Sequence, residues 1–153
     1  ASQFDPSLSW SDVAKIKKQW GGKLIVKGIL DVEDALAAVN VGADAIVVSN
    51  HGGRQLDGAV SSIAALPPIV DAVNDRAEVW MDSGIRSGQD VLRAIALGAQ
   101  GTMIGRAFLY GLGAKGQAGV RQALDIIYKE LDLTLGLCGQ SDLSKVDSSI
   151  LIK

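Results

Sequence analysis

The sequence predicts an α/β fold in which four parallel strands are covered by helices, and three observations support this. Four short apolar runs are typical of buried strands. They span residues 24–29, 45–49, 78–82 and 101–104. The segments between these runs have apolar residues at helical spacing, as expected for the helical crossovers that connect parallel strands. The tripeptide Gly-Ala-Asp at 42–44 is echoed by Gly-Ala-Gln at 98–100, each just before a strand, which indicates a repeated strand–helix unit.

The N-terminal part predicts two helices around the first strand. One helix is expected to begin near Ser9 and to close at Gly21-Gly22, ahead of the strand at 24–29. Asp31 can cap the next helix, and Gly42 ends it. The apolar residues of that second helix recur at helical spacing and are Val32, Ala35, Leu36 and Val39.

The middle of the chain continues the alternation. After the strand at 45–49, Ser61 can cap a helix over 61–73. Pro67-Pro68 should kink or interrupt this helix, because proline lacks the N–H that a helix interior needs. The strand at 78–82 is then followed by a helix over 88–97.

The C-terminal part predicts the last strand and two more helices. The strand at 101–104 leads into a helix from 106 toward 112, and Lys115-Gly116 separates it from a long helix over about 119–137. A polar tail follows. Cys138, the one cysteine, adjoins an apolar helical segment and is expected to be a buried thiol in the core.

Composition excludes several classes of protein. The chain has 153 residues, 48% of them hydrophobic, which suffices for one domain with a packed core. No linker divides it, so we expect a single domain over residues 1–153. The net charge of −2 offers no basic field for nucleic acid. No apolar run has the length of a membrane span, and residues 1–10 lack the features of a secretory signal, so we expect a soluble, cytoplasmic protein. We also expect no metal site.

Four strands leave the architecture open. A closed (β/α) barrel needs eight strands, typically in about 250 residues. The chain therefore forms either an open four-stranded sheet or half of a barrel.

The only histidine, His51, follows directly on the predicted strand at 45–49. In alternating βα proteins, the loops at the carboxyl ends of parallel strands carry ligands and catalytic groups. Gly52-Gly53 leave room for a substrate beside the imidazole, a group suited to general-base work near neutral pH. Arg54 would then hold a substrate carboxylate. The alternative is a structural histidine, the commoner role of a lone His.

Glycine and arginine occur together at two later strand ends. Gly84 and Arg86 follow the strand at 78–82, with Ser87 able to cap the next helix, and Gly105-Arg106 follow the last strand. Backbone N–H groups, helix N-termini and guanidinium forks all bind phosphate, so these ends predict a phosphate site. Alternatively, Gly84 serves a tight turn and the arginines pair with surface acids.

Lys27 is a cation in an apolar strand and needs a partner or a function. It could lie beside an electron-rich cofactor ring and stabilise the negative charge that develops on reduction. The alternative is a salt bridge with Asp31 or Asp82. Asp82 would bond cofactor hydroxyls or fix an arginine, and Asp57 would order the loop around the histidine.

Four runs of this sequence resemble the FMN-dependent 2-hydroxy-acid dehydrogenases and oxidases, a family of lactate-, glycolate- and mandelate-oxidising enzymes. The matching runs are residues 27–30, 49–57, 82–88 and 97–106. The likeness covers nearly the whole chain in the same order and spacing, and the run around His51 is highly specific.

The resemblance implies an FMN-bearing eight-stranded TIM barrel of which this chain is the C-terminal half, with the N-terminal half absent. In the family, the absent half supplies further FMN contacts, a tyrosine and a second arginine at the substrate site, and an aspartate that orients the histidine. We therefore expect the isolated chain to be inactive and to need the N-terminal half as its partner.

The resemblance also implies roles by position. His51 would take the hydroxyl proton of the substrate, and Arg54 would clamp its carboxylate. The implied FMN contacts are Lys27 and Ser49 at the flavin ring, Asp82 at the ribityl chain, and Gly84, Arg86, Gly105 and Arg106 at the phosphate. Ser83, in the same cofactor-binding loop, replaces a glycine found in some relatives and leaves the phosphate loop plausible.

The implied activity is oxidation of an L-2-hydroxy acid to the 2-oxo acid, with electrons passed to a quinone, a cytochrome or oxygen. A homotetramer is implied, either cytoplasmic or peripheral on the inner face of the membrane. Two alternatives remain at this point: another FMN- or phosphate-binding barrel enzyme, and a non-catalytic half-barrel that serves as a phosphate-binding or assembly module.

Overall fold

The computed structural model describes residues 7–152 and contains one four-stranded sheet. Its strands are β1 (Ile25–Ile29), β2 (Ala45–Val48), β3 (Glu78–Met81) and β4 (Gly101–Thr102). They lie in sequence order, and every neighbouring pair is parallel, which confirms the predicted α/β sheet. This order is that of a (β/α) barrel, whereas a doubly wound open sheet reverses its order at a switch point. The sheet therefore fits half of a barrel.

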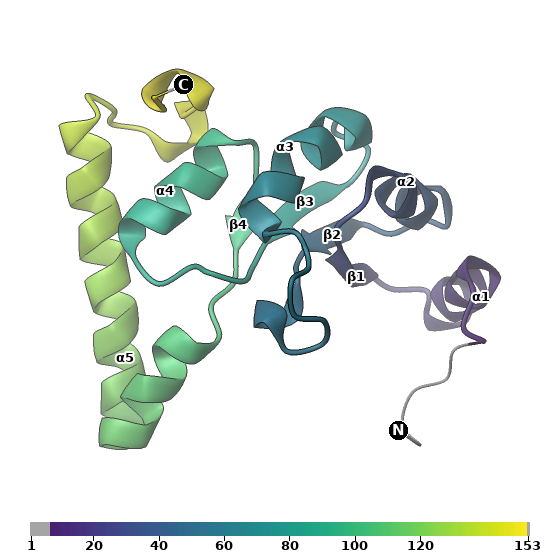
Figure 1. Ribbon diagram of the computed structural model, residues 1–153, viewed down its shortest axis with the longest axis horizontal. Helices are drawn as coiled ribbons and strands as arrows, with labels where there is room; N and C mark the ends of the chain where they lie inside the picture. Colours follow the sequence, from purple (N-terminus) through teal and green to yellow (C-terminus); the bar gives the residue numbers. More distant parts are fainter. Residues whose placement is uncertain (1–6, 153) are drawn as a thin grey trace.

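The helices alternate with the strands along the chain, as predicted. They are α1 (Trp10–Trp20), α2 (Val32–Asn40), α3 (Ser62–Val73), α4 (Gly88–Ala96) and α5 (Arg106–Leu137), with short 3₁₀ turns η1 (His51–Gly53), η2 (Leu143–Lys145) and η3 (Ser148–Ile150). Asp31 caps α2 as expected, since its carboxylate accepts from the backbone of Glu33 and Asp34. Figure 1 shows α2, α3 and α4 along one side of the strands, with α5 standing beside α4.

The core lies between the sheet and these helices. Alternate strand residues such as Ile46 and Met81 are buried with Leu66 and Ile69 of α3 in a single cluster. The strand residues that alternate with the core residues point to the opposite face of the sheet. Among them is Lys27 of β1, whose register partner on β2 is Val47. The helix-covered face thus supplies the stability, and the strand ends are left to carry the site.

Of the two outcomes expected at the prolines of the third helix, a kink or an interruption, the interruption does not occur. Pro67 and Pro68 lie inside α3, which is continuous from Ser62 to Val73. Each proline removes one N–H donor from the helix ladder. Burial of Leu66 and Ile69 against the sheet compensates for the lost hydrogen bonds and holds the helix together.

The break in the last helical segment is confirmed. α5 contains non-helical backbone at Lys115 and Gly116, which divides it into two helical arms. The arms meet at Gly111 and Gly119, where a Cβ added at Gly119 would lie within 2 Å of the Gly111 carbonyl oxygen. Only glycine permits so close a backbone approach.

Cys138 is exposed, contrary to the expectation of a buried thiol. It caps the C-terminus of α5, where the neighbouring Leu137 is 79% exposed. The apolar run before it predicts a helix correctly, but this last turn extends past the buried core.

Within residues 7–152, no helix combines the length and the apolar character needed to cross a membrane.

Candidate active site

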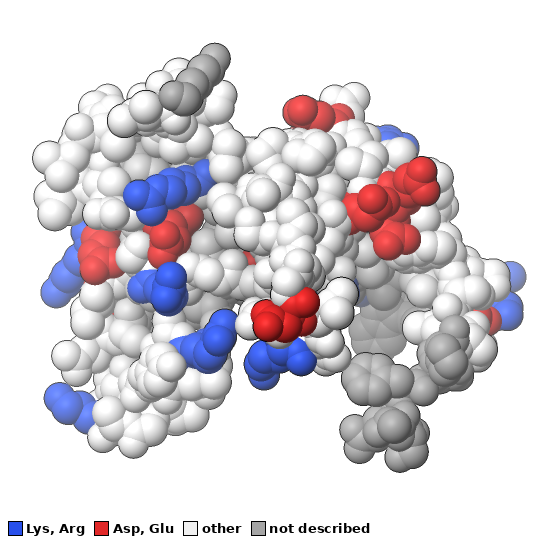
Figure 2. Space-filling view, in the orientation of Figure 1, with Lys and Arg blue, Asp and Glu red and all other residues white. Residues whose placement is uncertain are grey.

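The carboxyl ends of the strands border a cleft of about 670 Å³. Every predicted site residue lines it except Ser49, which is fully buried. In Figure 2, basic side chains border the hollow between α5 and the loop that follows β2. The structure thus brings together residues from four separate strand ends, as the loops of a parallel sheet allow.

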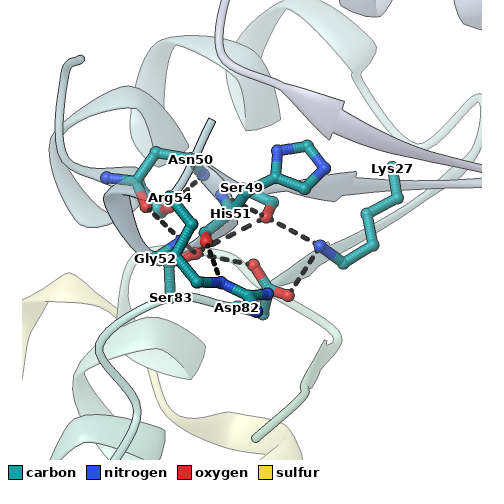
Figure 3. Close-up of polar contacts among 9 residues, drawn as sticks. Lys27, Ser49, Asn50, His51, Gly52, Arg54, Asp82 and Ser83 are labelled. Atoms are coloured by element: carbon teal, nitrogen blue, oxygen red, sulfur yellow. Dashed lines mark hydrogen bonds and ion pairs between the residues drawn. The ribbon is translucent and has the colours of Figure 1, made fainter. Parts of the chain in front are cut away.

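Lys27 points from β1 across β2 to the end of β3. Its Nζ lies 2.9 Å from Asp82 Oδ2 and donates to Ser49 Oγ at 2.9 Å, as Figure 3 shows. The predicted salt bridge with Asp82 therefore exists, whereas Asp31 is engaged in capping α2. The ion pair does not remove Lys27 from the cleft, because the lysine still lines it.

Asp82 is held in its ionised form by this network. Burial, the largest single effect, raises the pKa of its carboxyl, but hydrogen bonding by Ser49, Lys27 and Ser83 together with the Lys27 charge outweighs it. The net result is a pKa below the ordinary value. A fixed carboxylate therefore faces the lysine ammonium at the edge of the cleft.

The histidine loop, residues 50–54, has a left-handed backbone over three consecutive residues. His51, Gly52 and Gly53 have φ angles of 55°, 69° and 74°. The His51 N–H donates to Ser49 Oγ at 3.1 Å, and the Gly52 N–H donates to Asn50 Oδ1 at 3.0 Å. The two glycines adopt this conformation without strain, and they let the loop turn back over the strand ends.

Arg54 folds back over the same loop. Its Nε donates to the carbonyl oxygen of His51 at 3.1 Å, and its side chain lines the cleft together with His51. One bond to its own loop orients the guanidinium, whose fork geometry suits a carboxylate. The sequence-predicted pair of imidazole and guanidinium is therefore brought to one cleft.

The glycine–arginine ends, Gly84 with Arg86 and Gly105 with Arg106, also line the cleft. A Cβ added at Gly84 or Gly105 would meet no atom within 4 Å, so open space lies over both. Neither arginine forms an ion pair within residues 7–152, which goes against the alternative of pairing with surface acids. The Arg106 Nη2 instead lies 3.4 Å from the Gly52 carbonyl oxygen.

The two helix N-termini near these ends differ in what satisfies them. At α4, Asp90 accepts from the N–H groups of Arg86 and Ser87, and Glu130 of α5 accepts from Gly88 N at 3.0 Å. At α5, the N-cap Gly105 offers no side chain to its helix. An anion in the cleft would therefore meet unused donors at the start of α5 rather than at α4.

A family model described as FMN-dependent dehydrogenase matches residues 1–153. The chain belongs to the FMN-dependent dehydrogenase family. FMN, the cofactor expected from the resemblance, is the cofactor that defines this family.

Two curated relatives of this FMN-dependent dehydrogenase chain are bacterial L-lactate dehydrogenases. The protein from Caulobacter vibrioides (strain NA1000 / CB15N) is 55% identical over 151 residues, which cover 99% of this chain and 39% of that protein. The one from Pseudomonas syringae pv. syringae (strain B728a) is 54% identical over 153 residues, covering 100% of this chain and 40% of that protein. The chain thus spans about 40% of the length of these relatives.

Solved structures of mandelate oxidase share the fold. One, with a monooxide FMN adduct, has a TM-score of 0.87 and 48% identity, and the match covers 92% of this chain and 45% of that chain. Another mandelate oxidase structure has a TM-score of 0.86 and 48% identity, covering 89% of this chain and 40% of that chain. Both matches are consistent with the half-barrel expected for this FMN-dependent dehydrogenase chain.

The residues present fit the cofactor of the family. Open space above Gly84 and Gly105, flanked by Arg86 and Arg106, can accept a phosphate group. In the same cleft, Lys27 supplies a cation of the kind that stabilises a reduced flavin ring.

Several residues that shape the site had no predicted role. Ser62 Oγ accepts from Asn50 N at 3.1 Å and fixes the start of the histidine loop to α3. Gly28 lies against the His51 ring, and Asp90 orders the backbone of Arg86. The position of Gly28 inside a predicted strand, next to Lys27, could have predicted such a contact, because a glycine inside a strand often marks a close approach by another group.

Proposed function

We propose that this chain carries the catalytic and FMN-binding part of an enzyme that oxidises an L-2-hydroxy acid to the 2-oxo acid. The observation that supports it is one cleft in which His51 and Arg54 lie with the Lys27–Asp82 ion pair and both glycine–arginine ends. Base, carboxylate clamp, ring cation and phosphate donors are the parts that this reaction needs.

The roles follow from the chemistry of each side chain. His51 accepts the proton of the substrate hydroxyl at an imidazole nitrogen. Arg54 binds the substrate carboxylate through two parallel N–H bonds and so presents the hydroxyl to His51. Lys27, oriented by Asp82, places positive charge where negative charge develops on reduction. When bound, FMN supplies the acceptor for the two electrons that leave the substrate carbon with its hydrogen.

The glycine–arginine ends hold the phosphate in this proposal. Gly105 and Arg106 contribute the start of α5, and Gly84 and Arg86 contribute the turn after β3. Ser49 is fully buried behind the cleft, so it acts on the ring through Lys27, whose ammonium donates to its hydroxyl. Residues 1–153 then act as one unit, the C-terminal half of a barrel whose other half completes the site.

The partners are proposed from the relatives. The curated L-lactate dehydrogenases and the mandelate oxidase structures suggest a small 2-hydroxy acid as substrate. A quinone, a cytochrome or oxygen would receive the electrons, and a homotetramer is the proposed assembly.

The test is the intact mass and visible spectrum of the natively expressed protein that carries this chain. Flavin absorption that bleaches on anaerobic addition of L-lactate or L-mandelate, but not of the D-enantiomers, is the expected result. A flavin that no 2-hydroxy acid bleaches would point to another FMN-dependent barrel enzyme. Absence of flavin in the natively expressed protein would overturn the proposal, and His51→Gln should keep the flavin but lose the bleaching.

A further inference from the structure

Ser83 has a backbone conformation that favours glycine. Its φ angle is 70°, and it precedes Gly84, whose φ angle is 98°. A non-glycine residue in the left-handed region carries a steric cost. A glycine at position 83 would avoid that steric cost. The contacts of the serine hydroxyl therefore show what the serine contributes that a glycine would not.

The hydroxyl joins two strand ends. It accepts from the Gly52 N–H at 3.0 Å and donates to Asp82 Oδ1 at 2.9 Å. It also lies 3.5 Å from Ser49 Oγ. A hydroxyl has one donor and two acceptor sites, so it can make both principal bonds at once. Figure 3 shows Ser83 between the carboxylate and the histidine loop.

The other anchors of this loop come from the end of β2, from the loop itself and from the start of α5. Ser49, which follows β2, accepts from the His51 N–H and also hydrogen bonds with Asp82, whereas Asn50 is inside the loop itself. Arg106 reaches the Gly52 carbonyl from the start of α5 at the longer distance of 3.4 Å. The bond from Gly52 to Ser83 ties the backbone of residues 51–53 directly to the end of β3, whereas the connection through Ser49 passes by way of β2.

We propose that Ser83 is a positioning residue, whose hydroxyl locks the histidine loop to the Lys27–Asp82 ion pair so that base and ring cation keep a fixed geometry. The proposal deepens the proposed function and rests on it. It assigns to the serine hydroxyl a task toward the chain's own residues, which a glycine at this position would not perform.

Two variants separate the hydroxyl from the backbone strain. Ser83→Gly removes both the hydroxyl and the strain, whereas Ser83→Ala removes the hydroxyl and keeps the strain. Asn74→Gly is the matched control, because Asn74 also has a positive φ angle, 47°, but caps α3 away from the cleft. All three are made in the natively expressed holoprotein.

Turnover and loop protection are measured together. Both Ser83 variants should lower kcat by about 10- to 100-fold, because misplaced catalytic groups lose rate without losing binding. Hydrogen exchange at the Gly52 amide should speed up by about threefold or more as one of its two acceptors is lost. Asn74→Gly should change neither. The melting temperature of Ser83→Gly should not fall below that of Ser83→Ala.

The outcomes are decisive in both directions. Wild-type kcat with unchanged Gly52 exchange in Ser83→Gly would overturn the positioning role. A kcat that merely follows the melting temperature across the three variants would also overturn it, since that is the behaviour of a structural residue. If the unmodified protein oxidises no 2-hydroxy acid, the proposed function fails, while the exchange rate at Gly52 still tests the lock itself.

Discussion

The imidazole of His51 lies against the backbone of Gly28, so close that a Cβ at position 28 would be 2.7 Å from Cε1 of the ring. Gly28 also has a φ angle of 104°, which L side chains rarely adopt. β1 therefore determines where the imidazole can lie, although β1 and the histidine loop are far apart in sequence. A glycine at this point is required by the ring as well as by the backbone.

Gly28→Ala should displace the imidazole. The added methyl group meets the end of a side chain, so the ring moves more easily than the backbone. We expect kcat to fall by about 10- to 100-fold and stability to fall by about 1–2 kcal/mol from the backbone strain. Gly21→Ala is the control, because Gly21 has a φ angle of 67° with no atom near its Cβ position. Equal loss of activity in both variants would contradict the contact with His51.

Arg54→Lys should weaken substrate binding. Lysine keeps the positive charge, but it loses the fork and the oriented N–H that Arg54 donates to the His51 carbonyl. We expect KM for the 2-hydroxy acid to rise about tenfold or more while FMN stays bound. Arg93→Lys, at a solvent-exposed arginine paired with Asp90, controls for the general effect of the exchange. An unchanged KM in Arg54→Lys would rule out the carboxylate role.

The sequence predicted the strands and most of the helices, and the predicted site residues other than Ser49 line one cleft, but the contacts among them could not be predicted. Apolar runs bounded by glycine and acidic residues define the strands, and strand ends gather at one edge of a parallel sheet. The choice of Asp82 over Asp31 as the partner of Lys27 needed the register, since Lys27 reaches across β2. The contacts made by Gly28 and Ser83 depend on loop backbone angles that no spacing of residues encodes.

Asp82 should give the protein a stability that depends on pH. The folded-state pKa lies below the ordinary 3.8 because hydrogen bonds and Lys27 outweigh the opposing effect of burial. A lowered folded-state pKa means that this stabilisation is fully present above about pH 4 and is lost as the pH falls through the folded-state value. Urea midpoints of the protein and of Asp82→Asn, measured from pH 6 to pH 3, should therefore converge at low pH. A constant difference across the range would show that the carboxylate charge contributes nothing.

Gly88→Ala should separate α4 from α5. A Cβ at Gly88 would overlap the backbone of Glu130 and Leu131, and the Glu130 carboxylate would lose its bond to Gly88 N. Backbone atoms cannot rotate away as side chains do, so α5 must shift, at a cost of about 2 kcal/mol or more. Gly113→Ala is the control, because its Cβ position in α5 is open and alanine favours the helix. Because α5 begins at Gly105-Arg106, the shift should also weaken FMN binding, measured by flavin fluorescence on dilution. A destabilised protein with unchanged FMN affinity would mean that the start of α5 does not hold the phosphate.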